Sequence, residues 1–575
     1  MNVHVFATDY DGTIAEANHV AEPTAHALQR VRATGRKVLL VTGRMLPDLH
    51  AVCPDVDRMF DAVIAENGAV VYFPERREVR TLGDAPEPAL LEALRRRDVP
   101  FDVGRVILAT QAPFADAAVG AIRETGVERT LVFNKGALML LPGGVTKGTG
   151  LLAALNAFEL SAHNMVGIGD AENDHAFLAL SECAVAVADA VPALRERADY
   201  VTRAPGARGV LEFVEEHVLH DLIELMPRLG RHYLPLGEQA DGKPVAVAAH
   251  GTRLLVVGPS GTGKSTLTGV LAERILDADR SFLLLDPEGD YRTLADLERV
   301  VVFGGKGEQA LPAPEELEQL LRHPRTSLVL DLSAMTRPEK VGYATKVLGV
   351  VATVRSTQGL PHWLIIDEAH HVVPAEGSQA VELVRAGAEP LALITLAARD
   401  LAPAMARLPT EVASTEIAAF QEGVGSVLVA RGEPLPPPLT DGPPLERGEA
   451  ALAWLRAQPR VVRFRVGKRR VLHRRHVRKY TEGELPLDRS FFFRGPAGAL
   501  NLRAANLARF VELADGVDER TWIHHLRRGD YSRWLREQVK DAELAAEVET
   551  VERADLPAGE SRRRVLERVR QKYAV

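Results

Sequence analysis

Short apolar segments alternate with helix-like stretches twice along this 575-residue chain, and this alternation constrains the fold most strongly. In the first half the apolar segments occupy residues 3–9, 37–44, 62–67, 164–170 and 183–189. In the second half they occupy residues 253–261, 281–288, 299–305, 326–333, 362–370 and 391–397. Apolar strands that alternate with helices are typical of parallel sheets. The sequence therefore predicts two successive α/β domains.

The chain is too long for a single hydrophobic core, so its segments divide into domains. We predict a first α/β domain over residues 1–222 and a second over residues 235–432. The Pro-rich stretch 433–460 is predicted to be a linker. Residues 461–575 are predicted to form a C-terminal domain that opens with a basic strand and continues as helices.

Composition excludes several classes of protein. The content of 46% hydrophobic and 26% charged residues is typical of a globular protein, and the net charge of −8 argues against a surface that binds nucleic acid everywhere. The two cysteines, Cys53 and Cys183, are too few for a disulfide framework and suit a reducing compartment. No apolar run is long enough to span a bilayer, and no signal-peptide pattern is seen. We expect a cytoplasmic protein with no membrane partner.

Two aspartates follow the first apolar segment in the sequence DYDGT. Asp9 and Asp11 can surround one cation, and one carboxylate can attack phosphorus while the other handles a proton. Gly12 lets the chain turn sharply beside them. Thr42, near the end of segment 37–44, offers a hydroxyl that can hold a phosphoryl oxygen. Lys147, in GGVTKGTGL, can offset the negative charge of a phosphoryl group in transfer.

A second acidic pair ends the segment 164–170. Asp170 closes that segment and Asp174 follows four residues later, and both add the hard oxygen ligands that suit Mg²⁺. The motifs that hold Asp9, Thr42 and Asp170 each end an apparent parallel strand, and the motif of Lys147 does not. An open α/β sheet has its crevice at the carboxyl ends of its parallel strands. The sequence therefore predicts a Mg²⁺ site for phosphoryl transfer, with Asp9, Asp11, Asp170 and Asp174 as the metal ligands.

In the order of these motifs the chain resembles the haloacid dehalogenase-like hydrolases, in their Cof-type or sugar-phosphatase branch. ENGA at 66–69, GVTKGTGL at 144–151 and GDAENDHAF at 169–177 carry the closer match, which covers residues 1 to about 220. The resemblance implies a Rossmann-like fold, Asp9 as nucleophile, Asp11 as general acid and base, and Thr42 and Lys147 as phosphoryl clamps. It also implies a cap domain, here at about 75–140, which is short for this branch, so the resemblance does not give the substrate. The default expectation is a small phosphorylated molecule such as a phosphosugar or a phosphoglycolate-like molecule.

The second α/β domain opens with a P-loop, G-x-x-x-x-G-K-S, between a strand and a helical pattern. Backbone N–H groups of such a loop wrap phosphates, and Lys264 is expected to reach the β- and γ-phosphates of ATP. About 100 residues later an apolar strand ends in Asp367 and Glu368. We expect Ser265 and Asp367 to hold Mg²⁺ and Glu368 to polarise the attacking water. The predicted nucleotide-binding residues are Gly258, Ser260, Gly261, Thr262, Gly263, Lys264, Ser265 and Thr266.

GPSGTGKST at 258–266, LLLDPEGDY at 283–291 and LIIDEAH at 364–370 together resemble the HerA/FtsK-like translocase ATPases across about 245–430. That resemblance implies a homo-oligomer, with a hexameric ring as the family's arrangement, and an arginine finger from the neighbouring subunit. The polar sensor, often Gln followed by Arg, that usually follows strand 391–397 is replaced by LAARD. Arg399 and Arg407 are finger candidates, although a structural or surface role is the plainer interpretation of each.

Residues 461–480 hold nine Lys or Arg and no Asp or Glu. This basic run can contact a phosphate backbone, but for an acidic chain we favour a solvated or inter-domain face that pairs with acidic domains nearby. Two functions remain open. Either a phosphatase for a small metabolite is regulated or oligomerised by an ATP-binding module, or a ring ATPase translocates DNA while the phosphatase acts on nucleic-acid phosphates. We favour the first.

Overall fold

The structure is a computed structural model that describes residues 3–573, apart from 135, 227–228, 230–231, 306–308, 374–376, 387–389, 435–443, 456–459, 471–484, 486, 488, 499 and 540. The chain forms two compact units, residues 1–289 with 297–470, and residues 290–296 with 471–575. The first unit contains both α/β domains. Across the part of the chain that the structure describes, every helix is too short or too polar to traverse a lipid bilayer.

The first α/β domain is built on an eight-stranded sheet of order β14-β13-β12-β1-β4-β5-β6-β7. Its parallel strands are β1 (Val5–Thr8), β4 (Lys37–Val41), β5 (Ala62–Ala65), β12 (Met165–Gly169), β13 (Cys183–Ala186) and β14 (Tyr200–Val201). Strands β6 (Val70–Phe73) and β7 (Glu78–Thr81) run antiparallel. The parallel strands predicted from the sequence are therefore confirmed.

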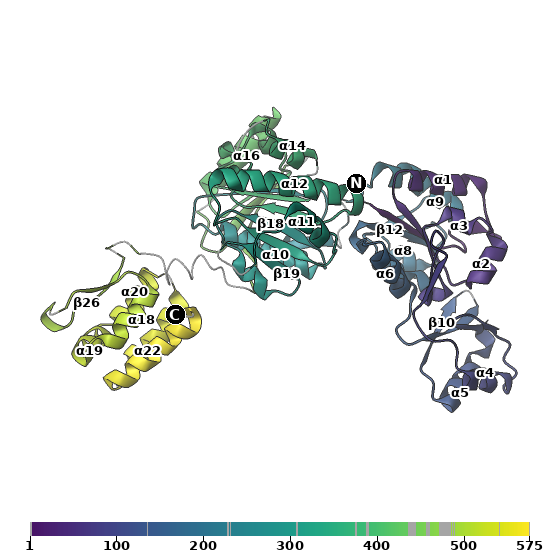
Figure 1. Ribbon diagram of the computed structural model, residues 1–575, viewed down its shortest axis with the longest axis horizontal. Coiled ribbons are helices and arrows are strands. Elements are labelled where there is room, and N and C mark those ends of the chain that lie inside the picture. The colour runs from purple at the N-terminus through teal and green to yellow at the C-terminus, as the bar shows by residue number, and fades with distance from the viewer. Residues whose placement is uncertain are drawn as a thin grey trace. The chain divides into compact units, whose positions relative to one another are not determined.

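Helices cover both faces of this sheet, which explains why its central strands are apolar along their whole length. Helices α1 (Glu22–Ala33) and α9 (Gly206–Glu216) pack together on one face, and α6 (Lys147–Ala157) and α7 (His175–Leu178) pack together on the other (Figure 1). Shorter elements connect the strands: β2 (Ala15–Glu16), β3 (His19–Val20), α2 (Leu46–Val52), α3 (Val56–Met59) and α8 (Pro192–Arg197).

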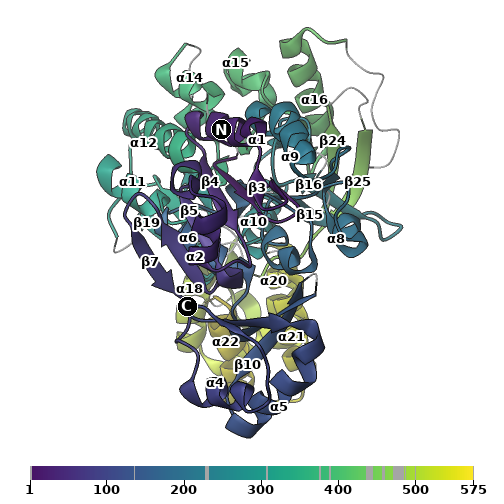
Figure 2. The same cartoon turned by 90° about the vertical axis from the view of Figure 1, so that its right-hand side faces the viewer.

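A small cap with its own hydrophobic core is inserted after β7 (Figure 2). Its antiparallel sheet, of order β10-β11-β9-β8, contains β8 (Asp102–Val103), β9 (Leu108–Gln111), β10 (Arg129–Asn134) and β11 (Ala137–Pro142). Helices α4 (Pro88–Arg95) and α5 (Ala115–Thr125) complete it. Compared with the predicted range of 75–140, β7 belongs to the main sheet, and β11 runs on to Pro142.

The second α/β domain is an eleven-stranded sheet of order β16-β15-β25-β24-β23-β17-β22-β21-β18-β20-β19. Its parallel strands are β17 (Arg253–Val257), β18 (Phe282–Asp286), β19 (Val300–Gly304), β20 (Ser327–Asp331), β21 (Trp363–Ile366), β22 (Leu391–Thr395) and β23 (Glu411–Ser414). The helices are α10 (Lys264–Asp277), α11 (Pro314–Leu321), α12 (Arg337–Gln358), α13 (Ala369–Val372), α14 (Gln379–Ala386), α15 (Pro403–Ala406) and α16 (Ile417–Arg431).

The predicted linker 433–460 needs correction, because it contains a strand of this sheet. Strand β24 (Glu449–Trp454) pairs antiparallel with β23, and β25 (Arg460–Val466) pairs with β24 and with β15 (Tyr233–Glu238), beside β16 (Pro244–Ala248). The domain boundary predicted at residue 461 therefore falls inside the second α/β domain. The sequence of β24, EAALAW, is rich in alanine, which has low strand propensity, so its signal was weak.

The described start of the basic run lies on this domain and pairs with acidic residues of α10. Arg470 donates its backbone N–H to Glu273 Oε2 at 2.9 Å, and its Nη2 lies 2.6 Å from Asp277 Oδ1. Arg469 Nε lies 3.5 Å from the buried Glu273. These contacts fit the interpretation of the run as a pairing face. Residues 471–480 of the run lie outside the described residues.

The second unit packs helices on a short hairpin. It contains β26 (Phe491–Phe493), β27 (Leu502–Ala504), α18 (Leu507–Gly516), α19 (Glu519–Arg527), α20 (Asp530–Glu537), α21 (Ala542–Glu552) and α22 (Ala558–Tyr573). Phe491, Phe493, Trp522 and Trp534 lie in its hydrophobic core, so these aromatic rings stabilise the unit and are not displayed to stack on bases.

Candidate active sites

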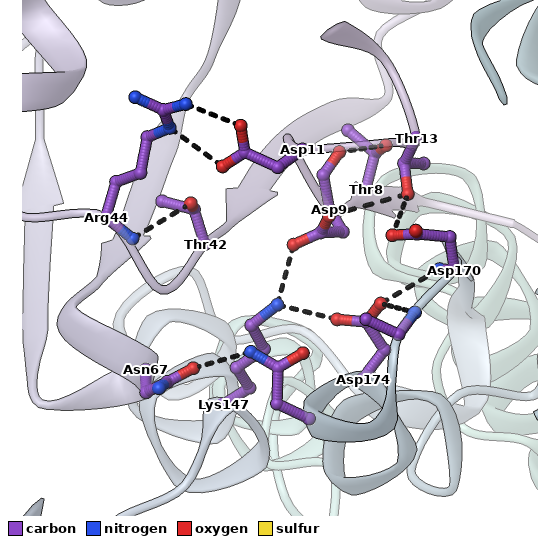
Figure 3. Close-up of polar contacts among 12 residues, drawn as sticks. Thr8, Asp9, Asp11, Thr13, Thr42, Arg44, Asn67, Lys147, Asp170 and Asp174 are labelled. Carbon is purple, nitrogen blue, oxygen red and sulfur yellow. Dashed lines mark hydrogen bonds and ion pairs between the residues drawn. The ribbon is translucent and has the colours of Figure 1, made fainter. Parts of the chain in front are cut away.

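The first predicted site forms at the carboxyl edge of the first sheet. Strand β1 lies between β12 and β4, with Thr8 opposite both Ile168 and Leu40. Asp9 directly follows Thr8, Thr42 follows the last residue of β4, and Asp170 follows the last residue of β12, so the three residues lie close together at this edge (Figure 3). Parallel strands expose the residues after their carboxyl ends in one crevice, which is the position that the sequence predicted.

Three carboxylates and one ammonium group meet in this crevice. Oxygens of Asp9, Asp170 and Asp174 lie within 4.8 Å of one another, and all three residues are buried. Lys147 Nζ donates to Asp9 Oδ1 and to Asp174 Oδ1, both at 2.6 Å. Asp174 Oδ2 accepts the backbone N–H groups of Asp170 and Ala171 at 2.9 Å, which fixes its orientation (Figure 3).

The charges of this cluster fit a divalent cation. Burial and the neighbouring charge of Asp174 raise the pKa of Asp9 from 3.8 to about 8, although Lys147 opposes this shift. Burial alone lowers the pKa of Lys147, but Asp174 and Asp9 outweigh it and raise that pKa above its ordinary value. Three carboxylates against one ammonium leave excess negative charge in a buried site, and their oxygens are the ligands that Mg²⁺ prefers.

The side chain of Asp11 is not part of that cluster. Arg44 holds it in a two-point ion pair, with Nε 2.7 Å from Oδ2 and Nη2 2.6 Å from Oδ1 (Figure 3). Asp11 is 42% exposed, so it faces the open side of the crevice. A carboxyl group in that position suits proton transfer to a leaving group better than metal ligation through its side chain.

Sequence reasoning missed two polar residues here. Arg44 is the last residue of segment 37–44, and Thr13 is the last residue of DYDGT, so both belong to motifs that the sequence analysis had identified. Thr13 Oγ1 donates to Asp170 Oδ1 at 3.2 Å and also lies 3.5 Å from Asp9 Oδ2. Thr13 therefore holds two of the carboxylates in place. Thr42 is fully buried, and its Oγ1 accepts the backbone N–H of Arg44 at 3.1 Å.

The loop ENGA packs against the start of α6 and so positions Lys147. Gly68 has a φ of +99°, and a Cβ atom there would lie 1.9 Å from the carbonyl oxygen of Thr146, so only glycine fits. Asn67 Oδ1 accepts from Asn173 at 2.9 Å, and Asn67 Nδ2 lies 2.6 Å from Met139 Sδ of the cap. The loop therefore contacts the catalytic core and the cap together.

Glu66 ties the same loop to the cap. Its fully buried carboxylate accepts the backbone N–H groups of Arg105, Val106 and Ile107 at 2.9, 3.0 and 3.2 Å. These residues lead into β9, and the cap strand β10 contacts the loop that carries Asp174. Sequence reasoning quoted ENGA but assigned no role to Glu66.

We expect Glu66→Gln to weaken substrate binding. The amide offers an N–H where three backbone N–H groups need an acceptor, and unpaired buried groups cost about 1–3 kcal/mol each. The cap is then held less rigidly against the site. We therefore expect KM for a phosphate ester to rise about tenfold while kcat changes less. Steady-state kinetics measure this, with Glu75→Gln, a change at an exposed carboxylate of the same domain, as the matched control. Unchanged KM and unchanged thermal stability would refute a cap-positioning role.

The second predicted site also lies at a carboxyl strand edge. Gly258, Gly261 and Gly263 adopt φ values of 149°, 83° and 117°, which bend the P-loop around its own backbone N–H groups. Lys264 begins α10 and is buried. Its Nζ donates to the carbonyl oxygens of Gly258 and Pro259 at 2.7 and 3.2 Å. Ser265 and Thr266 occupy the first turn of α10, as the motif requires.

The acidic pair predicted to act with this P-loop, Asp367 and Glu368, directly follows β21. Strand β22 lies between β17 and β21, so the P-loop and Asp367 follow the same edge of the sheet. Asp367 and Glu368 are both buried. Glu368 has a φ of 39°, and its Oε2 has no hydrogen-bond partner among the described residues, with His370 Nδ1 3.6 Å away. A buried carboxylate oxygen held this way is suited to polarise a water molecule.

Thr395 ends β22, the strand between these two motifs. The sequence did not point to it, because the polar sensor of the resembled ATPases, often a Gln, is expected beyond residue 397. Its hydroxyl lies 3.1 Å from His370 Nδ1. Arg399 and Arg407 lie on the surface, and Arg407 Nε donates to the Ala430 carbonyl at 2.8 Å. A finger role for either arginine depends on a neighbouring subunit and stays a prediction.

Comparison with known proteins places a match on each α/β domain. A family model described as haloacid dehalogenase-like hydrolase matches residues 6–104 and 114–214, and a model of the helicase HerA central domain matches residues 238–343. The chain is 33% identical to a phosphoglycolate phosphatase of Methanothermobacter thermautotrophicus over 222 residues, 37% of this chain and 97% of that relative. It is 30% identical to phosphoglycolate phosphatase 2 of Saccharolobus solfataricus, over 37% of this chain and 92% of that relative. A haloacid dehalogenase-like hydrolase structure from Bacteroides thetaiotaomicron aligns with 37% of this chain and 98% of its own, at 17% identity and a TM-score of 0.33.

Proposed function

Because the chain belongs to the haloacid dehalogenase-like hydrolases and joins this phosphatase domain to a HerA-type ATPase domain, we propose that it is a Mg²⁺-dependent phosphatase controlled by ATP. The observation that carries the proposal is the buried contact of Asp9 with Lys147, beside Asp170 and Asp174. This arrangement offers a nucleophile, a cation for the transferred phosphoryl group and a set of metal ligands in one crevice.

The proposed reaction has two steps at Asp9. A carboxylate oxygen of Asp9 forms a bond to phosphorus while the ester P–O bond breaks, and Asp11 gives a proton to the departing oxygen. Asp11 then takes a proton from water, which attacks the acyl phosphate and releases inorganic phosphate. Thr42 and Lys147 hold the phosphoryl oxygens in both steps. Asp9, Asp170 and the neighbouring Asp174 would hold Mg²⁺, which would supply positive charge to offset the negative charge of the phosphoryl group.

The proposed substrate is a small phosphate monoester. The small cap and the names of the relatives favour a phosphoglycolate-like carboxylate over a large phosphosugar. Phosphate release from phosphoglycolate, phosphosugars, nucleotides and 5′- or 3′-phosphorylated DNA measures the preference, with and without EDTA. We expect the highest kcat/KM with a small phosphate ester and loss of turnover in EDTA. Equal turnover with and without EDTA would refute the proposed dependence on Mg²⁺. A preference for phosphorylated DNA ends would favour the second candidate function, described below.

For the second domain we propose ATP hydrolysis that regulates or oligomerises the phosphatase. The P-loop binds the phosphates, Ser265 and Asp367 hold the Mg²⁺ of ATP, and Glu368 polarises water. The second candidate is a ring motor that translocates DNA while the phosphatase acts on nucleic-acid phosphates, and the match to the HerA helicase domain favours it. The rate of ATP hydrolysis with and without double-stranded DNA separates them: strong stimulation supports the motor, and an unchanged rate supports regulation.

A further inference from the structure

The two α/β domains meet through a buried ion pair at the amino-terminal ends of their strands. Arg280 lies just before β18 of the ATPase domain, and Glu182 lies just before β13 of the phosphatase domain. Arg280 Nη2 is 2.6 Å from both carboxylate oxygens of Glu182. Glu182 is 0% exposed and Arg280 is 1% exposed, so the pair is removed from solvent. Neither residue takes part in the chemistry proposed above.

Three histidines complete what we name the junction cluster: His163, Glu182, His250, Arg280 and His362. His163 Nδ1 and His250 Nε2 each lie 2.9 Å from Glu182. Burial acts to raise the pKa of Glu182, but Arg280 and His250 hold it well below its ordinary value. Burial lowers the pKa of His163 and of His362. The carboxylate of Glu182 is therefore ionised, and the Arg280 guanidinium is its buried partner.

A second link of the cluster joins the strands that lead to the two active sites. His362 Nε2 lies 3.0 Å from Ser161 Oγ, and His362 Nδ1 accepts the backbone N–H of Ser281 at 2.9 Å. His362 directly precedes β21, and Asp367 follows the end of that strand. Ser161 caps the turn that precedes β12, and Asp170 follows the end of that strand. One strand therefore separates the cluster from the acidic residue of each site.

A metal site is the alternative explanation of this cluster. His163, Glu182 and His232 bring possible ligand atoms within 4.8 Å of one another. However, this group holds a single carboxylate, and both of its oxygens already contact the Arg280 guanidinium, so no negative charge is left to hold a cation. The chemistry of the cluster therefore favours an ion pair that joins two domains.

We propose that the junction cluster couples nucleotide binding at the P-loop to the phosphatase site. This inference rests on the proposed function and adds its route of regulation. Sliding one domain against the other would leave Glu182 or Arg280 buried without its partner, which proteins avoid strongly. The amino-terminal ends of β18, β21, β12 and β13 therefore move together. A change at the carboxyl edge of β21 when nucleotide binds shifts β12 and, with it, Asp170.

The test compares phosphatase kinetics with and without a non-hydrolysable ATP analogue in the full chain. We expect the analogue to change kcat or KM about fivefold in the wild type, a typical size for coupling between sites. Hydrogen exchange of residues 161–170 is measured in parallel, because it reports the coupling without any phosphatase substrate. We expect the analogue to change this exchange in the wild type.

The decisive variant is Glu182→Leu with Arg280→Met, because replacing both members of a buried pair by apolar residues usually preserves the fold. We expect it to keep both basal activities and to lose both responses to nucleotide. Glu182→Gln alone should lose them too, with reduced thermal stability. The matched control is Arg322→Ala, since Arg322 pairs with Glu159 across the same junction at 3.7 Å but is 43% exposed. It should keep both responses.

Retention of both responses in the double variant would overturn the proposal. A cluster that holds a metal would also overturn it, shown by stoichiometric zinc in the purified protein that is absent from the double variant. Failure of the proposed function looks different. In that case no phosphate ester is hydrolysed, while hydrogen exchange of residues 161–170 still responds to the analogue in the wild type and not in the double variant.

Discussion

Replacing Asp9 with Asn is expected to abolish phosphate release, with a fall in kcat of about 10⁴ or more. The amide has no oxygen able to form the acyl phosphate and carries no charge for the metal. Lys147 can still donate to the amide oxygen, so the local packing should persist. Release of phosphate from p-nitrophenyl phosphate measures the effect.

The control for this change is Asp55→Asn, an isosteric loss of an exposed carboxylate in the same domain. It should leave turnover unchanged, and circular dichroism should show both variants folded. Appreciable turnover by the Asp9→Asn variant would show that Asp9 is not the nucleophile, whether or not that turnover requires Mg²⁺.

Lys264→Ala is expected to weaken ATP binding about 100-fold or more and to stop ATP hydrolysis. The Lys264 ammonium contacts the Gly258 and Pro259 carbonyls of the P-loop, and we expect it to turn to the phosphates of a bound nucleotide. Titration calorimetry with ATP measures the loss. Lys346→Ala, an exposed lysine on α12, is the control and should bind ATP as the wild type does. Unchanged affinity in Lys264→Ala would show that the loop does not surround phosphate.

The sequence predicted the strands and the acidic residues at their ends because both depend on local pattern. Each parallel strand is a short apolar run, and Asp9, Asp170 and Asp367 directly follow such runs. Once the strands are parallel, their carboxyl ends must share an edge. For this reason, the placement of Asp9 beside Asp170 could be inferred without coordinates.

What could not be predicted depends on contacts between residues far apart in the chain. The sequence around Glu182 gives no sign that Arg280 will pair with it. A single charged residue in a sequence is usually exposed to solvent, so burial of Glu182 was not expected. The partners of Glu66, at residues 105–107, are backbone groups and leave no pattern of side chains. Asp11 lies two residues from Asp9, yet the ion pair with Arg44 directs its side chain away from the other carboxylates.

The boundary error near residue 461 has a similar origin. Strands β24 and β25 continue the ATPase sheet in the antiparallel direction after a Pro-rich stretch, and the prolines were taken to end the domain. A strand of small residues such as Ala450 and Ala451 is stabilised by its neighbours in the sheet more than by its own propensity.

Trapping the acyl phosphate tests the central claim most directly. The wild-type enzyme is quenched in acid during turnover of phosphoglycolate, treated with borohydride to reduce any acyl phosphate, and mapped by peptide mass spectrometry. The account predicts reduction of the residue 9 carboxyl group to an alcohol, in an amount that depends on substrate and Mg²⁺. Steady phosphate release with an intact Asp9 carboxylate, or with the label on another residue, would contradict it.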